Sequence, residues 1–135
     1  MKILVVEDDK IAQLGIKKIL SLMDVPVQII LAENGKEALD YFVQTNDEGT
    51  DIVLLDLNMP VMNGFEFLEM IRGKDKLKDL PVIVHTTSDN IVDLKKCRNL
   101  GISGYFVKHV DYSTFKDNLQ NIVKYWAESK QKGPQ

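Results

Sequence analysis

Acidic side chains directly follow two of the short apolar runs in this sequence. Glu7, Asp8 and Asp9 come after residues 3–6, and Asp56 comes after residues 52–55. Carboxylates gathered in one place repel one another and raise the pKa of one of them unless a cation is present. Oxygen ligands of this kind suit Mg²⁺, which prefers octahedral oxygen coordination. If the fold brings these acids together, they form a magnesium site.

Hydroxyl and amine groups follow two later apolar runs. Thr86 stands after residues 82–84, with Thr87 and Ser88 behind it, and Lys108 follows residues 105–107. A lysine and a hydroxyl that face a bound cation are well placed to hold phosphoryl oxygens. The four strand-end groups together indicate a phosphoryl-transfer centre.

Five apolar, largely β-branched runs alternate with segments of helical spacing, and these elements must position the polar groups. The runs are residues 3–6, 27–31, 52–55, 82–84 and 105–107. Helical intervals relate the apolar residues of the segments between and after them: Ala12, Ile16, Ile19, Leu20 and Met23, then Ala38, Leu39, Phe42 and Val43, then Phe67, Leu68 and Ile71, and finally Phe115, Leu119, Ile122, Val123 and Trp126. Asp111 is the expected N-cap of the last helix.

Runs that are apolar throughout predict strands covered on both faces, and strict strand–helix alternation predicts a parallel sheet. The predicted fold is therefore a doubly wound (βα)5 α/β sandwich, with a five-stranded parallel sheet and helices on both faces. Ligands of such sheets lie outside the carboxyl ends of the strands. We expect one domain over residues 1–128 and a flexible tail over residues 129–135.

Composition narrows the function classes. The 135 residues carry a net charge of −3 with a pI near 5.4, which does not favour nucleic-acid binding. Cys97 is the single cysteine, so we expect a small, half-buried thiol in a reducing compartment. The N-terminal run is too short for a signal peptide, and no stretch is long enough to span a bilayer, so we expect a soluble cytoplasmic protein without a membrane partner.

The motifs VEDD and LLDLNMPVMNG, followed by Thr86 and Lys108, resemble the receiver domain of two-component response regulators. The resemblance covers essentially the whole chain and implies the flavodoxin-like, CheY-like version of the predicted fold. It implies that Asp56 is the phosphoacceptor. It also implies an Mg²⁺ ion held by Asp56 and Asp8, by Glu7 through water, and by the backbone carbonyl of Asn58.

The resemblance assigns roles to three further residues. Thr86 is expected to hydrogen-bond a phosphoryl oxygen and to move toward it, and Lys108 to pair with that group after pairing with Asp56. Tyr105 is expected to turn inward as the switch aromatic. Asp9 is expected to begin the first helix instead of binding metal, Pro60 to fix φ after Met59, and Gly64 to allow a tight approach into the next helix.

The predicted function is that of a stand-alone receiver, without a DNA-binding output domain. A sensor histidine kinase or phosphotransfer protein is the expected donor, and a downstream protein the expected target. The chain is not expected to be an enzyme beyond self-catalysed phosphotransfer and autodephosphorylation. The expected signalling surface, which also suits a homodimer, is formed by the last strand and the helices on either side of it, including Leu94, Lys95, Tyr105 and Lys116.

Two positions depart from the family pattern. His109 stands where a proline with a preceding cis peptide is usual, which leaves open whether the Lys108–His109 peptide is cis or trans. Thr87 replaces a small residue, which narrows access to the phosphoryl site. His85 is expected to pack in the core.

Two alternative functions remain open. A phosphohydrolase of the haloacid dehalogenase type also uses a strand-end aspartate, but it needs an acid two residues later, where this chain has Asn58. A pseudo-receiver would signal by binding alone, although Glu7, Asp8, Asp56, Thr86 and Lys108 are all present. A flavodoxin is disfavoured because no Ser/Thr/Gly-rich phosphate loop follows the first strand.

Overall fold

Strands and helices alternate along the chain, as the apolar runs predict. The computed structural model describes residues 1–108 and 111–131. In chain order its elements are β1 (Lys2–Val6), α1 (Lys10–Ser21), β2 (Gln28–Ala32), α2 (Gly35–Gln44), β3 (Ile52–Leu55), α3 (Gly64–Arg72), β4 (Val82–Thr86), α4 (Ile91–Asn99), β5 (Gly104–Val107) and α5 (Tyr112–Gln131). Asp111 precedes α5 and its Oδ2 accepts the Thr114 backbone N–H at 3.1 Å, as expected of an N-cap.

The strands form one parallel sheet in the order β2-β1-β3-β4-β5. Val6 is opposite Leu55 across β1 and β3, and Thr86 is opposite Val107 across β4 and β5. Because parallel strands end at the same edge, the residues that follow them leave the sheet close together. Strand order reverses between β1 and β3, so this edge is also where ligands of doubly wound sheets bind.

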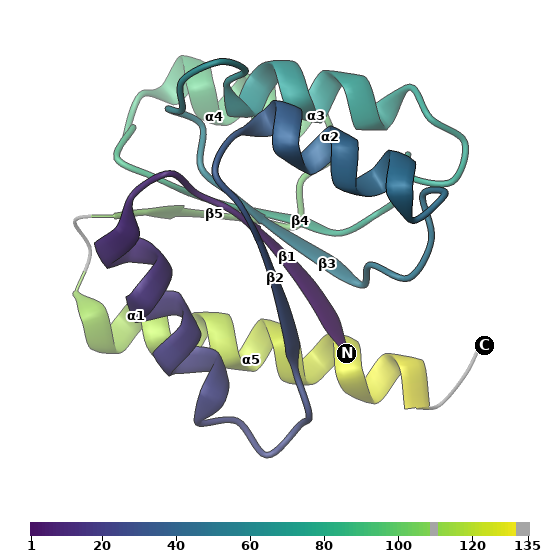
Figure 1. Ribbon diagram of the computed structural model, residues 1–135. Coiled ribbons are helices and arrows are strands. Elements are labelled where there is room, and N and C mark those ends of the chain that lie inside the picture. Colours follow the sequence, from purple (N-terminus) through teal and green to yellow (C-terminus); the bar gives the residue numbers. More distant parts are fainter. Residues whose placement is uncertain (109–110, 132–135) are drawn as a thin grey trace.

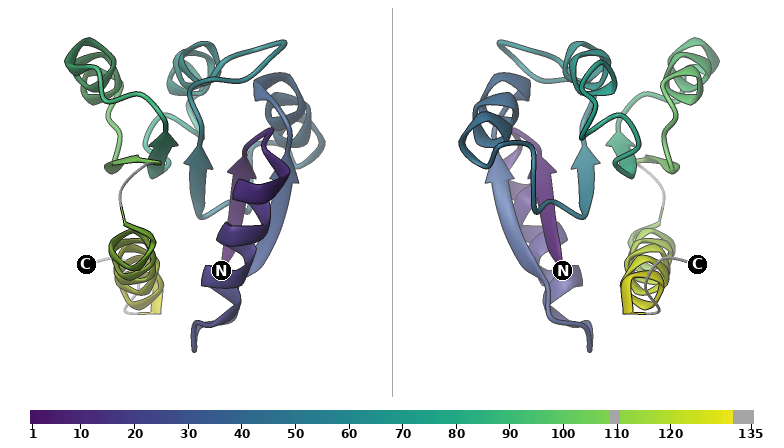
Figure 2. Two further views of the ribbon diagram at one scale, coloured as in Figure 1. Left: turned by 90° about the vertical axis from the view of Figure 1, so that its left-hand side faces the viewer. Right: turned by 90° about the vertical axis from the view of Figure 1, so that its right-hand side faces the viewer.

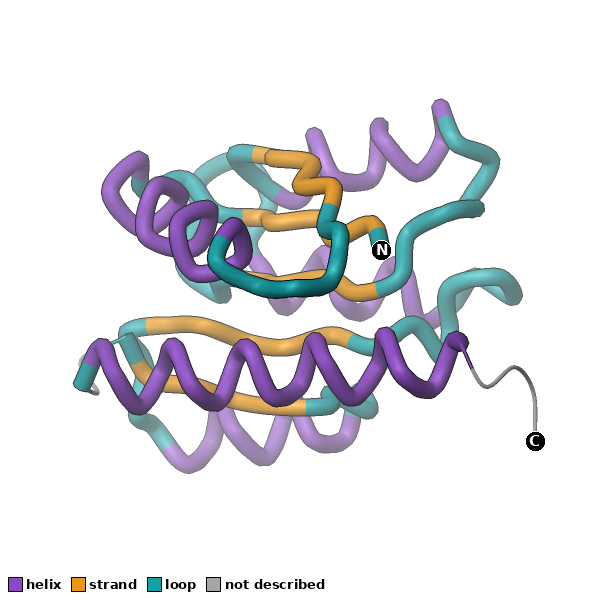
Figure 3. The backbone as a smooth tube through the Cα atoms, turned by 90° about the horizontal axis from the view of Figure 1, so that it is seen from below, coloured by secondary structure: helices purple, strands orange, loops and turns teal. Residues whose placement is uncertain are grey.

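The helices cover both faces of the sheet. Figure 1 shows α2, α3 and α4 on one face and α1 and α5 on the other. Views turned by 90° show the sheet between the two helical layers (Figure 2). Figure 3 looks onto the second face and shows the long α5 running along it to the C-terminal end. The predicted doubly wound α/β sandwich is confirmed.

Each face of the sheet has its own apolar core, because successive side chains of a strand point to opposite faces. Leu4 and Val6 join the cluster under α2, α3 and α4, where Phe42 and Phe67 stack with ring centroids 6.3 Å apart. The second cluster lies under α1 and α5 and contains the alternate strand residues. Burial of each large apolar side chain contributes about 1.5–3 kcal/mol to folding.

The structure differs from the sequence-based expectation at three places. Strand β2 lies at the edge of the sheet and is only partly covered, with Leu31 36% exposed, so coverage on both faces was wrongly expected there. Val43 follows the helical spacing of Ala38 and Leu39, but it is 70% exposed. Helix α5 continues to Gln131, three residues past the predicted boundary at 128. Residues 132–135 of the predicted tail lie outside the described part of the chain.

Arg72 joins the C-terminal ends of α3 and α4. Its Nε donates to the Leu100 carbonyl at 2.7 Å, and its two terminal nitrogens donate to the carbonyls of Leu77 at 3.0 Å and Gly101 at 3.2 Å. Three hydrogen bonds from one rigid guanidinium group hold these backbone segments in a fixed arrangement.

No helix within residues 1–108 and 111–131 is long and apolar enough to cross a membrane.

Candidate functional site

Three carboxylates meet at the carboxyl end of the sheet. Glu7 and Asp8 follow β1 and Asp56 follows β3, and one carboxylate oxygen from each lies within 4.8 Å of the others. Glu7 and Asp56 are only 2% and 4% exposed, whereas Asp8 is open to solvent. The structure therefore brings together the acids that the sequence places at strand ends, with one of the three accessible from outside.

Lys108 extends from the end of β5 into this acidic pocket. Its Nζ lies 2.7 Å from Glu7 Oε1 and 3.4 Å from Asp56 Oδ2. The expected pairing of Lys108 with Asp56 is present, but Glu7 is the nearer partner. One ammonium group is thus shared by two buried carboxylates.

The pocket shifts the proton affinities of these groups. Burial raises the pKa of Glu7 to about 7, and the neighbouring charge of Asp56 adds to that rise, while the hydrogen bond from Lys108 opposes it. Burial alone would lower the pKa of Lys108, but the Glu7 hydrogen bond and the two negative charges outweigh it, so this pKa is raised. A single lysine does not fully compensate the buried acids, and the site favours a further cation.

Asn58 connects the loop after β3 to the end of β4. Its Nδ2 donates to the hydroxyl of Thr86 at 3.4 Å and to that of Thr87 at 3.3 Å. Thr86 is fully buried, and its Oγ1 also accepts the backbone N–H of Ser88 at 3.3 Å. The Thr87 side chain is exposed at the rim, where the sequence predicts that it narrows access.

Backbone packing fixes the orientation of the Asp56 loop. The Asn58 backbone N–H donates to Asp56 Oδ1 at 3.3 Å, and the Gly64 N–H donates to the Leu57 carbonyl at 3.0 Å. A Cβ at Gly64 would lie 2.4 Å from the Asp56 carbonyl oxygen, a distance that no real contact permits. The expected close approach at Gly64 is therefore confirmed.

The loop between β1 and α1 is held by one residue that was expected and one that was not. Asp9 is the N-cap of α1 and accepts the Ile11 N–H at 3.0 Å, as predicted. Gln13, which was not predicted as a site residue, is 5% exposed, and its Nε2 donates to the Glu7 carbonyl at 2.6 Å. A sequence signal was available, because Gln13 is polar yet shares a helix face with the buried Ile16.

Tyr105 connects β5 to the loop that follows Thr86. Its hydroxyl donates to the Ser88 carbonyl at 3.0 Å, and Ser88 Oγ donates to Asp93 Oδ2 at 2.6 Å. The Tyr105 side chain is half-buried against the core under α4. It is therefore placed to respond to movement of the segment that follows Thr86.

The remaining titratable candidates are in the core. Cys97 is fully buried instead of half-buried, and burial raises the pKa of its thiol to about 11, so the thiolate needed for reactivity is scarce. His85 is 9% exposed and stacks on Phe115, with ring centroids 4.1 Å apart, which confirms core packing. The Lys108–His109 peptide lies outside the described residues.

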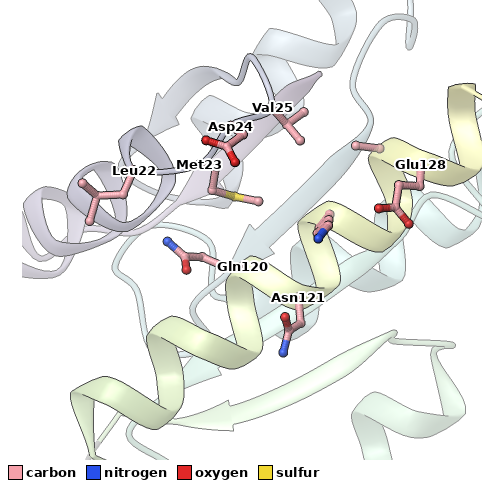
Figure 4. Close-up of a pocket in the computed structure, with 9 residues that line it drawn as sticks. Leu22, Met23, Asp24, Val25, Gln120, Asn121 and Glu128 are labelled. Carbon is pink, nitrogen blue, oxygen red and sulfur yellow. The ribbon is translucent and has the colours of Figure 1, made fainter.

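A separate cavity of about 410 Å³ lies away from the acids, between the segment after α1 and helix α5 (Figure 4). Its polar side chains include Asp24, Gln120, Lys124 and Glu128, and so carry both signs of charge. The amide of Gln120 is already bonded to the Ile19 carbonyl at 3.0 Å. This mixture points to no particular ligand.

The chain is similar to known response regulators over most of its length. The family model of the response regulator receiver domain matches residues 3–120. The chemotaxis protein CheY homolog of Campylobacter jejuni is 31% identical over 123 residues, which cover 91% of this chain and 92% of the relative.

Two solved structures share the fold. The phosphorylated cyanobacterial phytochrome response regulator RcpA has a TM-score of 0.84 and 32% identity over 95% of this chain and 94% of its own. The Mn²⁺-bound form of response regulator Rcp1 has a TM-score of 0.82 and 29% identity over 93% of both chains. Sequence and fold agree over the same residues, and the chain belongs to the receiver domains of two-component response regulators.

Proposed function

We propose that this receiver accepts a phosphoryl group on Asp56 and signals through the resulting change in its surface. The main support is the position of Asp56. It is nearly buried at the end of β3, beside two further carboxylates, and its Oδ2 lies 3.4 Å from the Lys108 Nζ. A similar structure is described as phosphorylated, which supports the same chemistry here.

The acidic pocket fits a magnesium ion. Carboxylate oxygens are the ligands Mg²⁺ prefers, and the similar protein Rcp1 has a Mn²⁺-bound form. Asp8 and Asp56 would bind directly, Glu7 through water, and Asn58 by its backbone carbonyl. When bound, the ion screens the repulsion between the phosphoryl group and the carboxylate.

In the proposed reaction, one Asp56 carboxylate oxygen attacks the phosphorus of the phosphoryl group on the donor histidine. The new O–P bond forms as the P–N bond to the donor imidazole breaks, and an acyl phosphate results. Lys108 and the Thr86 hydroxyl hold the phosphoryl oxygens. Water later attacks the phosphorus, the P–O bond to Asp56 breaks, and inorganic phosphate leaves with the free carboxylate restored. The reactions of the chain are thus phosphotransfer and autodephosphorylation.

The position of Asn58 disfavours a phosphohydrolase. Its amide faces Thr86 and Thr87 and cannot protonate a leaving group. A pseudo-receiver remains the second candidate, and phosphoryl transfer to Asp56 distinguishes the two.

The donor is a sensor histidine kinase or a phosphotransfer protein in the cytoplasm. The output surface comprises α4, β5 and α5, with Leu94, Lys95, Tyr105 and Lys116 as contact residues. This surface binds a downstream protein or a second copy of the chain.

The test is incubation with acetyl phosphate and Mg²⁺, followed by intact-mass measurement. We expect one added phosphoryl group in the wild type, none without a divalent ion, and none in Asp56→Asn. The matched control is Asp9→Asn, because Asp9 caps α1 beside the site, and we expect it to be labelled like the wild type. Equal labelling of Asp56→Asn would remove Asp56 from this role, and no labelling of the wild type would favour the pseudo-receiver.

A further inference from the structure

Ser88 connects three parts of the molecule through its own polar groups. Its backbone N–H donates to Thr86 Oγ1 at 3.3 Å, and its carbonyl accepts the hydroxyl of Tyr105 at 3.0 Å. Its side-chain hydroxyl donates to Asp93 Oδ2, in the first turn of α4, at 2.6 Å. One residue therefore contacts the expected phosphoryl-binding threonine, strand β5 and helix α4.

The first turn of α4 is capped through the Ser88 hydroxyl. In α3, the Asn63 backbone N–H donates directly to the Glu66 carboxylate at 3.2 Å, which completes an ordinary capping box. Asp93 has the corresponding position in α4, but its side chain is one methylene group shorter. The Ser88 hydroxyl lies between the two partners, because it accepts the Asn90 N–H at 3.3 Å and donates to Asp93. The cap of α4 thus includes a residue that lies outside the helix.

Apolar packing does little to hold this turn in place. Of the nine residues of α4, all within the described part of the chain, only Cys97 is buried. Ile91 and Val92 are 57% and 65% exposed, whereas the charged Asp93 is more covered than either. A cavity of about 500 Å³ lies between α4 and β5, so that side of the helix is also open. The position of the first turn therefore depends on the hydrogen bonds of Ser88.

The role of Asp93 is larger than that of an ordinary acid in the first turn of a helix. Such an acid stabilises the helix dipole, and an exposed carboxylate does this without a side-chain partner. Asp93 instead accepts a short hydrogen bond from a hydroxyl, and bonds to a charged acceptor are the stronger kind. A bond of this kind corresponds to at least about tenfold in an equilibrium constant. It is strong enough to make the position of α4 depend on Ser88.

We propose that the Ser88–Asp93 hydrogen bond transmits the movement of Thr86 to the first turn of α4. This inference rests on the proposed function, in which the Thr86 hydroxyl moves toward the phosphoryl group on Asp56. That movement displaces Ser88, whose N–H is bonded to the same hydroxyl. Asp93 and the start of the helix follow, because the Ser88 hydroxyl holds both. Ser88 and Asp93 are thus positioning residues, and their connection is separate from Tyr105, which contacts the Ser88 carbonyl.

Backbone amide shifts of the ¹⁵N-labelled chain test the proposal. Spectra are recorded in Mg²⁺ with and without beryllofluoride, and the wild type is expected to shift at residues 86–87 and 91–94. Ser88→Ala should retain the shifts of residues 86–87 and lose those of residues 91–94. Asp93→Ala breaks the same bond from the helix side and should give the same loss. Asp93→Asn keeps an acceptor oxygen and should retain the response.

Asn90→Ala is the matched control for a general loss of helix stability. The Asn90 side chain accepts the Val92 N–H at 2.8 Å, so its removal weakens the same cap and leaves the Ser88–Asp93 bond in place. This variant should retain the shifts of residues 91–94. Loss of these shifts in Asn90→Ala as well would assign the effect to the stability of the turn and contradict the proposal. A full wild-type response of Ser88→Ala and Asp93→Ala would overturn it.

Labelling with acetyl phosphate, followed by intact-mass measurement of the same samples, separates this inference from the proposed function. Ser88→Ala and Asp93→Ala are expected to take one phosphoryl group, as the wild type does. A labelled wild type whose residues 91–94 do not shift would overturn the inference and leave the proposed function in place. No labelling of the wild type would overturn the proposed function and this inference with it.

Discussion

Gln13 is the residue that holds the acidic loop in position. Its buried amide donates to the Glu7 carbonyl at 2.6 Å, directly beside two of the clustered acids. Gln13→Leu removes this bond and leaves the carbonyl unpaired. We therefore expect Mg²⁺ affinity to fall about tenfold, the equivalent of one lost hydrogen bond, measured by Mg²⁺ titration monitored by NMR.

Gln120→Leu is the matched control for that prediction. Gln120 also donates a side-chain amide hydrogen bond to a backbone carbonyl, that of Ile19. It lies away from the acids, in the cavity of about 410 Å³ beside α5. Its replacement should lower the free energy of unfolding by about 1 kcal/mol and leave Mg²⁺ affinity unchanged. If both variants lost Mg²⁺ affinity equally, Gln13 would have only a general stabilising role.

His85 should make stability depend on pH. Its folded-state pKa is about 4, below the ordinary value of 6.5, because the ring is buried near Lys108. Between these values the unfolded state binds more protons, so the free energy of unfolding should fall as pH falls from 6.5 to 4, by up to about 1.4 kcal/mol per pH unit.

Urea unfolding at pH 7, 6 and 5 measures this slope. His85→Phe keeps an aromatic ring against Phe115 but cannot titrate, so the difference between wild type and variant isolates the histidine. Glu7, whose pKa is raised to about 7, acts in the opposite sense and is present in both proteins. Parallel stability curves for the two proteins would show that His85 does not carry the effect.

The sequence predicted those residues of the candidate site whose reactive side chains directly follow a strand. Asp56 and Lys108 follow apolar runs, and a parallel sheet brings such ends together whatever their separation in sequence. The shared pairing of Lys108 with Glu7 could not be predicted, because it depends on side-chain conformations within the pocket. Gln13 was missed although it is a polar residue on a buried helix face, because a side chain that bonds a backbone carbonyl adds no charge pattern to the sequence.

At the scale of the elements, two glycines should respond in opposite ways to the same substitution. Gly64→Ala places a Cβ 2.4 Å from the Asp56 carbonyl oxygen and should lower the free energy of unfolding by about 3 kcal/mol. Gly15→Ala meets no neighbouring atom and should raise it by about 1 kcal/mol through helix propensity. Chemical denaturation of the two variants checks both values. A comparable loss in both would mean that α1 is packed more tightly than the structure shows.

The sequence predicted the burial of a strand correctly where helices cover both faces of that strand. Central strands such as β3 are covered by helices on both faces and have uninterrupted apolar runs. Strand β2 has a similar run, yet it lies at the sheet edge, because strand order is decided by tertiary packing. Val43 fits the helical period but lies on an exposed part of α2, since the width of a buried stripe depends on the neighbouring helix.

At the scale of the whole molecule, phosphorylation has to change a distant surface. An acyl phosphate adds about two negative charges, while shifting a population from 1:99 to 99:1 needs about 5.5 kcal/mol of differential stabilisation. On the proposed function, we expect Thr86 and Lys108 each to supply an interaction with the phosphoryl group that favours the active state. We expect Thr86→Ala to accept phosphate on Asp56 yet respond weakly, and Lys108→Ala to be more severely uncoupled.

Amide hydrogen exchange over residues 88–108, with and without a beryllofluoride mimic of the phosphoryl group, measures that response. The matched control is Thr87→Ala, because Thr87 shares the Asn58 contact but its side chain is exposed. It should retain the wild-type change in protection. A full wild-type change in both Thr86→Ala and Lys108→Ala would refute the proposed coupling to Tyr105.

The three hydrogen bonds of Arg72 determine how helix α4 can move. Two of them fix the backbone at Leu100 and Gly101, just after the helix ends. The opposite end of the helix follows the Ser88 segment that Tyr105 contacts. A helix held at one end and displaced at the other turns as a lever. Displacement should therefore be largest at Ile91 and Val92, whose side chains are exposed, and smallest at Asn99. We therefore expect a partner that distinguishes the two states to contact the first turn of α4, far from the end that Arg72 holds.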